Sequence, residues 1–435
     1  VNADGSLTVV TDASLSNLVS GGALSLATTA GSLSSLASGG ITAAGNLLLQ
    51  AGGAESDLIL GGALANTAGH SSLNAGRDLL QNADIVASGS GKSLDLLAAR
   101  HLSQSEGAEL GSADGNILLR AASGDITVER IDAGGAGLRI DAVLGNVLDQ
   151  DGDVEVDLIA GSLLLHAGGA IGSAANHLET RVGTLTANAQ GGGLYLTESD
   201  GLVIDSLGIE VERVNAQGGS ASTAYGAQSG LTATGDLLLV VEAGDLTVSD
   251  DVSAGGNLLL QAAADLTLNN GLTSAGHLSL LAGGDIAQHA DIGSGGSLDV
   301  QSGGGIAMDD GADGEAAGNL RYVATGELSL SRLAGGDLSL QASRILDSGS
   351  SDIDLIGNTL RLIATGTGAD DSVGTATQHL SLQVNKLAAN VAGQGGVWLD
   401  EADALTLGAS GDLNVNRVNA DGSLTVVTDA SLSNL

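Results

Sequence analysis

The sequence predicts an all-β protein whose fold class is a parallel β-helix, a solenoid with about 20 residues and three short strands per turn. Three observations support this prediction. A glycine-led phrase recurs at intervals of 18 to 22 residues between Gly235 and Leu340. Aliphatic residues in each phrase alternate with variable ones, as in a strand with one buried face. No segment keeps the period of a helix, and the turns are rich in Gly and Asn, which tolerate positive φ angles.

The first strand of each turn follows the leading glycine. Its outer two positions are aliphatic, so we expect them inside the coil. Its middle position varies between apolar, polar and charged residues, so we expect it on a free outer face. The phrases concerned are 235–239, 256–260, 276–280, 296–300, 318–322 and 336–340.

Two further phrases supply the second and third strands. The second strands are 245–248, 265–268, 285–288, 305–308 and 327–330, and the third strands centre on Val252, Leu272 and Ile292. Equivalent strands of successive turns would pair about 4.8 Å apart, which stacks Leu, Ile, Val and Ala into columns. At roughly 21 turns, the coil would be on the order of 100 Å long.

Composition agrees with a narrow coil. A chain of 435 residues would normally form two or more globular domains, but a solenoid grows by turns that contact only their neighbours. The chain has no Phe, Pro or Cys, one Trp and three Tyr, whereas a globular core usually holds large aromatic side chains. We therefore expect one continuous shaft over residues 1–435, without a disulfide framework or a thiolate metal site.

A long repeat encloses the short one. Residues 1–18 return unchanged as 418–435, after 417 residues, so we expect a longer tandem array in which 418–435 starts the next unit. The sequence Arg-Val-Asn-Ala at 213–216 recurs at 417–420, which divides the unit into halves of about 1–213 and 214–417. Charged or Gly-rich stretches interrupt the period, and there we expect loops or longer arms that leave the coil: 84–91, 150–155, 208–217 and 366–372.

Three phrases carry a resemblance to a known family. Gly-Asn-Leu-Leu-Leu-Gln-Ala at 256–262, Ala-Gly-Gly-Asp-Ile at 282–286 and Ser-Gly-Gly-Gly-Ile at 302–306 resemble those of the filamentous-haemagglutinin-like giant repeat adhesins of Gram-negative bacteria. The resemblance covers nearly the whole chain as a style of repeat. It implies a right-handed parallel β-helix within a secreted, extracellular fibre on the bacterial cell surface, which serves adhesion or contact with another cell. The near-perfect long repeat departs from that pattern and favours a fibre of regular spacing.

Charge and hydropathy limit the partners. A net charge of −37 argues against a nucleic-acid partner, because the two molecules would repel each other. No run reaches the roughly 18 apolar residues of a membrane-spanning helix, so no membrane insertion is expected in this segment. The partners we expect are neighbouring repeats of the same chain, other copies in a bundled fibre, and a host, partner-cell or glycan surface.

Acidic residues suggest one ladder along the coil. Asp245, Asp265, Asp285 and Glu327 precede the second strand of successive or near-successive turns. Carboxylates stacked at this spacing repel one another, so the ladder is either a solvated corner or a site bridged by Ca²⁺.

A second candidate for Ca²⁺ is the run 149–157. Asp149, Asp151, Asp153 and Asp157 resemble a calcium loop. The glycine of this run does not occupy the EF-hand position, and the counterpart 347–354 holds fewer acids. We therefore favour a turn over a metal site and expect no cofactor, with Ca²⁺ as the open alternative.

An enzyme and a carbohydrate-binding or carbohydrate-active β-helix are the alternatives to a structural shaft. Glycosidases and lyases need converging carboxylates or a cation in a cleft. The chain has only two lysines and dispersed arginines, and its paired acids lie adjacent in sequence, so no enzyme activity is expected. Tyr195 and Trp398 occupy equivalent positions in the two halves. They are candidates for surface contact with a glycan, but we favour a plug for a wide part of the coil or a cover over a loop.

Overall fold

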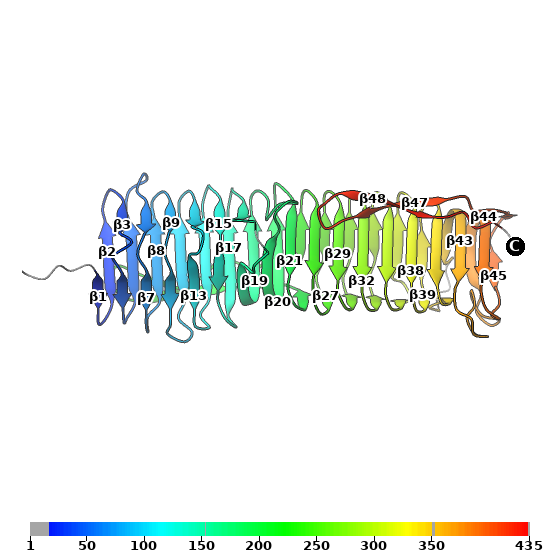
Figure 1. Cartoon of the computed structure of the whole chain (residues 1–435), viewed down its shortest axis with the longest axis horizontal. Coiled ribbons are helices and arrows are strands. Elements are labelled where there is room, and N and C mark those ends of the chain that lie inside the picture. The colour runs from blue at the N-terminus through cyan, green and yellow to red at the C-terminus, as the bar shows by residue number, and fades with distance from the viewer. Residues whose placement is uncertain (1–16, 153, 350–352, 434–435) are drawn as a thin grey trace, which may run out of the picture.

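A computed structural model describes residues 17–152, 154–349 and 353–433, and in these residues the chain forms strands and turns without any helix. The strands coil into one elongated rod of about 18 turns, with β1 and β45 at opposite ends of the rod (Figure 1). The predicted parallel β-helix is confirmed. The turns are fewer than the 21 predicted, because residues 205–230 and 408–433 leave the coil.

Equivalent strands of successive turns pair in parallel. The first strands are β2 (Leu24–Thr28), β5 (Leu47–Ala51), β8 (Ser71–Ala75), β11 (Leu94–Ala98), β14 (Ile117–Ala121), β17 (Gly137–Ala142), β21 (Leu194–Glu198), β26 (Leu237–Val241), β29 (Leu258–Ala262), β32 (Leu278–Ala282), β35 (Leu298–Ser302), β38 (Leu320–Ala324), β41 (Leu338–Ala342) and β45 (Leu399–Glu401). The second strands are β3 (Leu33–Ser35), β6 (Leu58–Leu60), β9 (Leu79–Gln81), β12 (Leu102–Gln104), β15 (Ile126–Val128), β18 (Val147–Asp149), β22 (Leu202–Ile204), β27 (Leu246–Val248), β30 (Leu266–Leu268), β33 (Ile286–Gln288), β36 (Ile306–Met308), β39 (Leu328–Leu330), β42 (Ile345–Asp347) and β46 (Thr406–Leu407). The third strands are β1 (Leu18–Ser20), β4 (Ile41–Ala43), β7 (Leu64–Asn66), β10 (Ile85–Ala87), β13 (Glu109–Ser112), β16 (Arg130–Asp132), β25 (Leu231–Ala233), β28 (Val252–Ala254), β31 (Leu272–Ser274), β34 (Ile292–Ser294), β37 (Asp313–Ala316) and β40 (Arg332–Ala334). Four longer strands run through a corner: β19 (Leu158–Ala167), β20 (Leu178–Ala189), β43 (Leu355–Ala364) and β44 (Leu380–Val391).

The core consists of aliphatic columns that run along the rod. Leu258 of β29 pairs in register with Leu237 of the turn before and with Leu278 of the turn after, and all three side chains are fully buried. Full burial of a leucine side chain contributes about 2 kcal/mol relative to exposure. The alternation read from the sequence therefore places the inner side chains correctly.

One aromatic side chain lies inside the coil, where the sequence predicted only aliphatic columns. Tyr322 of β38 is fully buried, and its hydroxyl donates a hydrogen bond to Gln288 Oε1 at 3.2 Å. A Cβ atom added to Gly314 would lie 2.6 Å from the Tyr322 hydroxyl oxygen. Glycine at this position of the column makes the room that the phenol needs.

The faces of the rod exchange roles halfway along the chain. Val147 of the second strand β18 pairs with Ile171, and Ile171 pairs with Leu194 of the first strand β21. The face built from second strands in the N-terminal half therefore continues as the face of first strands in the C-terminal half. Val373 makes the same link between Ile345 and Val397 near the C-terminal end.

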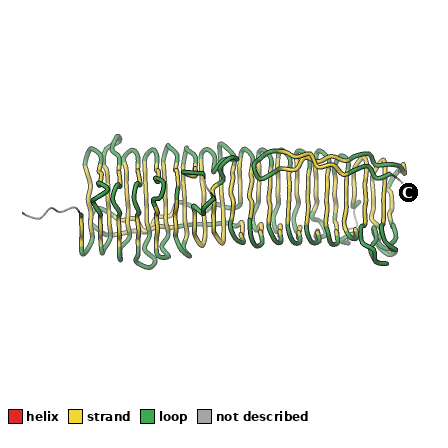
Figure 2. Tube along the Cα trace, viewed as in Figure 1, coloured by secondary structure: helices red, strands yellow, loops and turns green. Residues whose placement is uncertain are grey.

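Two antiparallel hairpins leave the coil and run lengthwise along the rod. We call them arm 1, with strands β23 (Glu210–Val214) and β24 (Ser220–Ala224), and arm 2, with strands β47 (Leu413–Val418) and β48 (Leu424–Asp429). Figure 2 shows arm 2 running along the length of the rod, across several turns.

The predicted interruptions of the coil are partly right. The stretch 208–217 belongs to arm 1, and 150–155 and 366–372 contain turns. The stretch 84–91 contains the regular third strand β10, so the expected loop is wrong there. The charged residues that suggested it flank the strand rather than replace it.

Candidate functional site

The acidic ladder lies at an exposed corner, as one alternative predicted, and it also links the turns. Asp245 and Asp265 each accept the backbone N–H of the next residue of the ladder, at 3.1 and 2.7 Å, and Asp285 accepts the N–H of Gly305 at 2.7 Å. Glu327 instead accepts a hydrogen bond from Arg344 Nε at 2.6 Å.

In the N-terminal half, His and Asn share the same corner position with carboxylates such as Asp125, which accepts the N–H of Asn146 at 2.8 Å. His101 Nδ1 accepts the N–H of Asp125 at 3.0 Å, and Asn146 Oδ1 accepts the N–H of Ala170 at 2.8 Å. At this corner, a backbone N–H of each turn points towards the corner side chain of the turn before. The corner therefore requires one short side chain per turn that accepts this hydrogen bond. The ladder therefore does not need a bridging cation.

The run 149–157 brings only part of its predicted ligands together. Oxygen atoms of Asp149 and Asp157 lie within 4.8 Å of each other and of Glu179, whereas Asp151 is exposed and donates its N–H to Asp149 at 3.3 Å. Asp153 lies outside the described residues. Glu179 sits one turn later on β20, so its proximity could not be seen from the local sequence.

Asp157 is the buried member of this carboxylate cluster. Its side chain accepts the N–H of Glu179 at 3.0 Å, and the residue is 4% exposed. Burial, with the charges of Asp149 and Glu179, raises the pKa of Asp157 to about 9. The cluster offers the oxygen ligands that Ca²⁺ takes, but three carboxylates are fewer than the 6–8 ligands of a full site.

The C-terminal half replaces one of the three carboxylates. Asp347 and Asp354 correspond to Asp149 and Asp157, but Ser381 stands in the place of Glu179. The Ser381 hydroxyl and N–H both donate to Asp354, at 3.0 and 2.7 Å. A hydrogen-bond donor therefore occupies the position that a third metal ligand would need.

Tyr195 lies under the tip of arm 2. Its side chain packs against the buried cluster of Leu238, Leu259 and Val418, and its ring centroid is 6.0 Å from that of His177. Burial raises the pKa of the Tyr195 phenol. The Tyr195 side chain is therefore half-buried between the coil and arm 2.

Trp398 occupies the equivalent place in the last turn. It lies at the bend that leads into β45, is partly exposed, and its neighbour Val397 is 47% exposed. The described part of the chain places no hairpin tip over it, unlike Tyr195.

Arm 1 is clasped onto the outer face of the coil. The N–H groups of Val214 and Glu212 donate to the hydroxyls of Ser72 and Ser93, at 2.8 and 3.0 Å. Arg213 Nε donates to Asp95 Oδ2 at 3.0 Å. These contacts hold one strand of the hairpin across successive turns.

Cation–π contacts and hydrogen bonds hold the residues that directly follow the second strand of arm 1. The guanidinium groups of Arg120 and Arg139 lie over the Tyr225 ring, 5.3 and 5.6 Å from its centroid. The Tyr225 hydroxyl accepts a hydrogen bond from Arg213 at 2.7 Å. Arg139 also donates to the carbonyl of Gly226 at 2.8 Å.

Arm 2 repeats the clasp. Val418 and Asn416 donate to the hydroxyls of Ser279 and Ser297, both at 2.9 Å, and Arg417 Nε donates to Asp299 Oδ2 at 2.6 Å. Each contact matches one of arm 1, so the clasp belongs to the duplicated unit.

The predicted free outer face is wrong where the arms lie. The middle positions of the first strands include Ser72, Asp95, Ser279 and Asp299, and all four are fully buried. Their polar character serves contacts with the arms rather than contact with water. Sequence reasoning missed them because the arm and its partner lie more than 100 residues apart.

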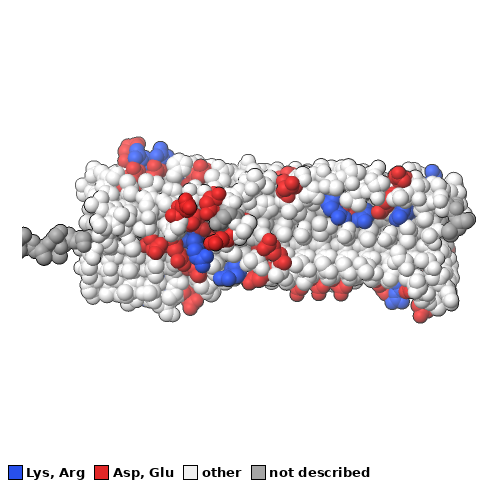
Figure 3. Space-filling model, viewed as in Figure 1, with Lys and Arg blue, Asp and Glu red and all other residues white. Residues whose placement is uncertain are grey.

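Charged side chains gather in separate clusters on the face seen in Figure 3, and broad stretches of the rod between them carry none. The described residues include no helix with the length and apolar character of a membrane span.

The sequence matched no family model, and neither curated proteins nor solved structures gave a significant match.

Proposed function

We propose that this chain is a segment of the shaft of a giant secreted fibre on the bacterial cell surface, whose task is to span distance in adhesion or in contact with another cell or surface. The observation that carries the proposal is the unbroken coil of about 18 turns. At about 4.8 Å per turn, the segment extends roughly 85 Å.

The internal repeats support this proposal. Both halves carry the same coil, the same arm and the same Arg–Asp clasp, Arg213 to Asp95 and Arg417 to Asp299. A solenoid gains length by adding such units, because each turn contacts only its neighbours. Selection for reach would produce this kind of duplication.

The surface supports the proposal as well. The net charge of −37 keeps a long rod soluble and discourages lateral contact between rods at low salt. The arms cover polar and apolar side chains that would otherwise be exposed along one face of each half.

Cells that display the unit in one, two or four copies, between the same anchor and the same terminal binding domain, test this function. The measurement is attachment to a ligand that lies beneath a polymer brush of fixed thickness. We expect attachment to rise with the copy number at equal display density. Attachment independent of copy number would contradict a role in reach, and glycan binding lost in Trp398→Ala would favour the carbohydrate-binding alternative.

A further inference from the structure

A hollow of about 450 Å³ lies beside arm 1, between the hairpin and the outer face of the coil. Arg213 of arm 1 and Tyr225, which directly follows the arm, line one side of it. The coil lines the other side with Asn74, Leu97 and Arg120, which pair in register on three successive turns, and with neighbouring alanines. Polar groups that converge over an apolar lining are typical of small-molecule sites.

The hollow carries an excess of positive charge. Three guanidinium groups contact the Tyr225 side chain, those of Arg120, Arg139 and Arg213. Two carboxylates pair with these guanidinium groups, those of Asp95 and Asp141. Three positive charges therefore meet two negative ones, in a chain whose net charge is −37. An anion with a single charge would balance this set.

Two of the three arginines keep donors for such an anion. Arg120 uses Nη1 for Asp141, and Arg213 uses Nε and Nη2 for Asp95 and the Tyr225 hydroxyl. Arg120 Nη2 and Arg213 Nη1 donate no hydrogen bond to any residue that the structure describes. The two side chains are 31% and 35% exposed, so solutes reach them. A carboxylate is an acceptor that matches the planar guanidinium group.

The hollow also contains an acceptor that the chain leaves unsatisfied. Asn74 Oδ1 is buried and accepts no hydrogen bond from the described residues. Buried polar atoms of native proteins usually have a partner in the protein, in water or in a ligand. The chain alone therefore does not complete the polar contacts of this hollow.

The C-terminal half fills the same place with its own side chains. Strand pairing puts Gln301 at the position of Leu97 and Val323 at the position of Arg120. Gln301 Oε1 accepts a hydrogen bond from Arg417 Nη2 at 2.7 Å. Arm 2 therefore finds an acceptor on the coil where arm 1 meets an aliphatic side chain.

The residue that follows the clasp arginine by 12 positions differs as well. It is Tyr225 beside arm 1 and Asp429 in arm 2. Asp429 accepts a hydrogen bond from Arg321 Nε at 3.2 Å. In the C-terminal half, a carboxylate of the chain itself thus binds an arginine of the coil, whereas Tyr225 offers the arginines of the N-terminal half no carboxylate.

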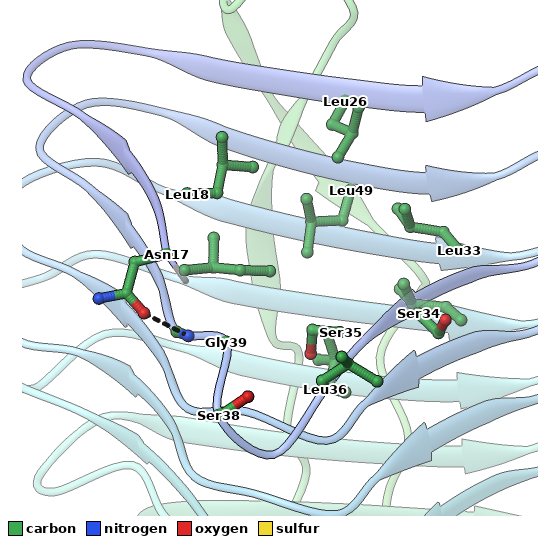
Figure 4. A pocket seen from close by; sticks show the side chains of 14 residues that line it. Asn17, Leu18, Leu26, Leu33, Ser34, Ser35, Leu36, Ser38, Gly39 and Leu49 are labelled. Atoms are coloured by element: carbon green, nitrogen blue, oxygen red, sulfur yellow. Dashed lines mark hydrogen bonds between the residues drawn. The ribbon is translucent and has the colours of Figure 1, made fainter. Parts of the chain in front are cut away.

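Figure 4 shows a different hollow, at the first described turn, where Leu26, Leu33 and Leu49 lie. Its described lining consists of aliphatic residues, Ser, Gly and one Asn, without a charged side chain. It offers no cationic group to a ligand, in contrast to the hollow beside arm 1.

We propose that the hollow beside arm 1 binds a small organic carboxylate with a single negative charge. The carboxylate lies between Arg120 and Arg213, and the apolar body of the ligand rests on Leu97 and the alanines of the coil. This inference goes beyond the proposed shaft function and does not depend on it. It assigns a ligand to a position that Gln301 fills in the other half.

Benzoate is the probe for this site, because it joins one carboxylate to an apolar ring. Isothermal titration of the 435-residue chain should show one benzoate bound per chain. Benzamide has the same ring without the charge, so it should bind at least tenfold more weakly. Sulfate lacks the apolar body and should bind more weakly too; a sulfate affinity equal to that of benzoate would overturn the assignment of an organic ligand.

Two variants locate the bound benzoate. Arg120→Gln removes one guanidinium group, and Leu97→Gln reproduces the C-terminal arrangement by giving Arg213 an acceptor on the coil. Each should weaken benzoate binding tenfold or more. Lys92→Gln removes the same charge as Arg120→Gln outside the lining of the hollow, and it should bind benzoate like the unmodified chain.

Amide hydrogen exchange in residues 210–224 shows whether arm 1 stays in place in each variant. No benzoate binding by the unmodified chain, full affinity in either hollow variant with arm 1 in place, or an equal loss in Lys92→Gln would each overturn the inference. A chain that binds no benzoate but still scatters as a rod of roughly 85 Å would leave the shaft proposal intact.

Discussion

At the scale of single residues, the corners of the coil explain much of the polar sequence. Asp265 illustrates the rule, since it donates its own N–H to Asp245 and accepts the N–H of Asp285. Asn, Asp and His all present an acceptor atom close to the backbone, which is why they replace one another at this position. The acidity of the ladder is therefore secondary to its hydrogen bonds.

Substitution of Asp265 separates the effect of its charge from the effect of its hydrogen bond. Asp265→Ala removes the acceptor for the Asp285 N–H and should cost about 1 kcal/mol, with faster amide hydrogen exchange at Asp285. Asp265→Asn keeps the acceptor and relieves charge repulsion, so it should cost less than half as much. Equal exchange rates in the two variants would contradict the rule.

The raised pKa of Asp157 leads to a second prediction at this scale: the stability of the folded chain should fall as the pH rises. Its pKa lies near 9 in the folded chain and near 4 in the unfolded chain, so folding takes up a proton between these values. Stability is then greatest below about pH 4 and falls as the pH rises towards 9, by at most about 1.4 kcal/mol per pH unit.

Asp157→Asn, compared with the unmodified chain in thermal unfolding at pH 5 and pH 8 without divalent cations, checks this effect. The substitution should raise the melting temperature at pH 8 more than at pH 5. An equal shift at both values would show that Asp157 is charged in the folded chain. Abolition of the pH effect in the unmodified chain by added Ca²⁺ would support the calcium alternative.

At the scale of elements, the arms convert a variable outer face into a buried one. Asp95 is fully buried beneath arm 1, and burial raises its pKa despite the pairing with Arg213. A charge buried in this way is tolerable only while its partner stays in place.

Arg213→Ala should therefore release arm 1. Loss of one partner of a buried ion pair costs about 3–5 kcal/mol, which we expect to appear as faster hydrogen exchange in residues 210–224. The added substitution Asp95→Asn removes the buried charge and should restore part of the protection. Arm 2, with its own Arg417 and Asp299, serves as the internal control and should be unaffected; release of both arms would contradict a local clasp.

The arms also mark the limit of what the sequence predicts. The repeated Arg-Val-Asn-Ala of 213–216 and 417–420 was visible, and so was the interruption at 208–217. Their hairpin form was not deduced, although Gly218 and Gly422 at the tips have positive φ angles of 82° and 76°, which suit a tight turn. Contacts across more than 100 residues leave no local pattern, so the sequence predicts Ser279 on the free outer face, whereas arm 2 buries it.

At the scale of the whole molecule, the period of the sequence was enough to predict the fold class and the residues that form the buried inner columns. It could not show that the faces exchange roles at Ile171 and Val373, because the phrase has the same length on either side of the shift. It also overestimated the number of turns, since arm residues were counted as coil. The right-handed sense of the coil stays a prediction.

The most direct test of the continuous coil is electron microscopy of a two-unit chain, made of residues 1–417 followed by residues 1–435. If the junction between units copies the junction within them, images will show one straight rod of roughly 170 Å, twice the length of the single chain. Two lobes joined at a variable angle, or a rod that does not lengthen, would contradict it.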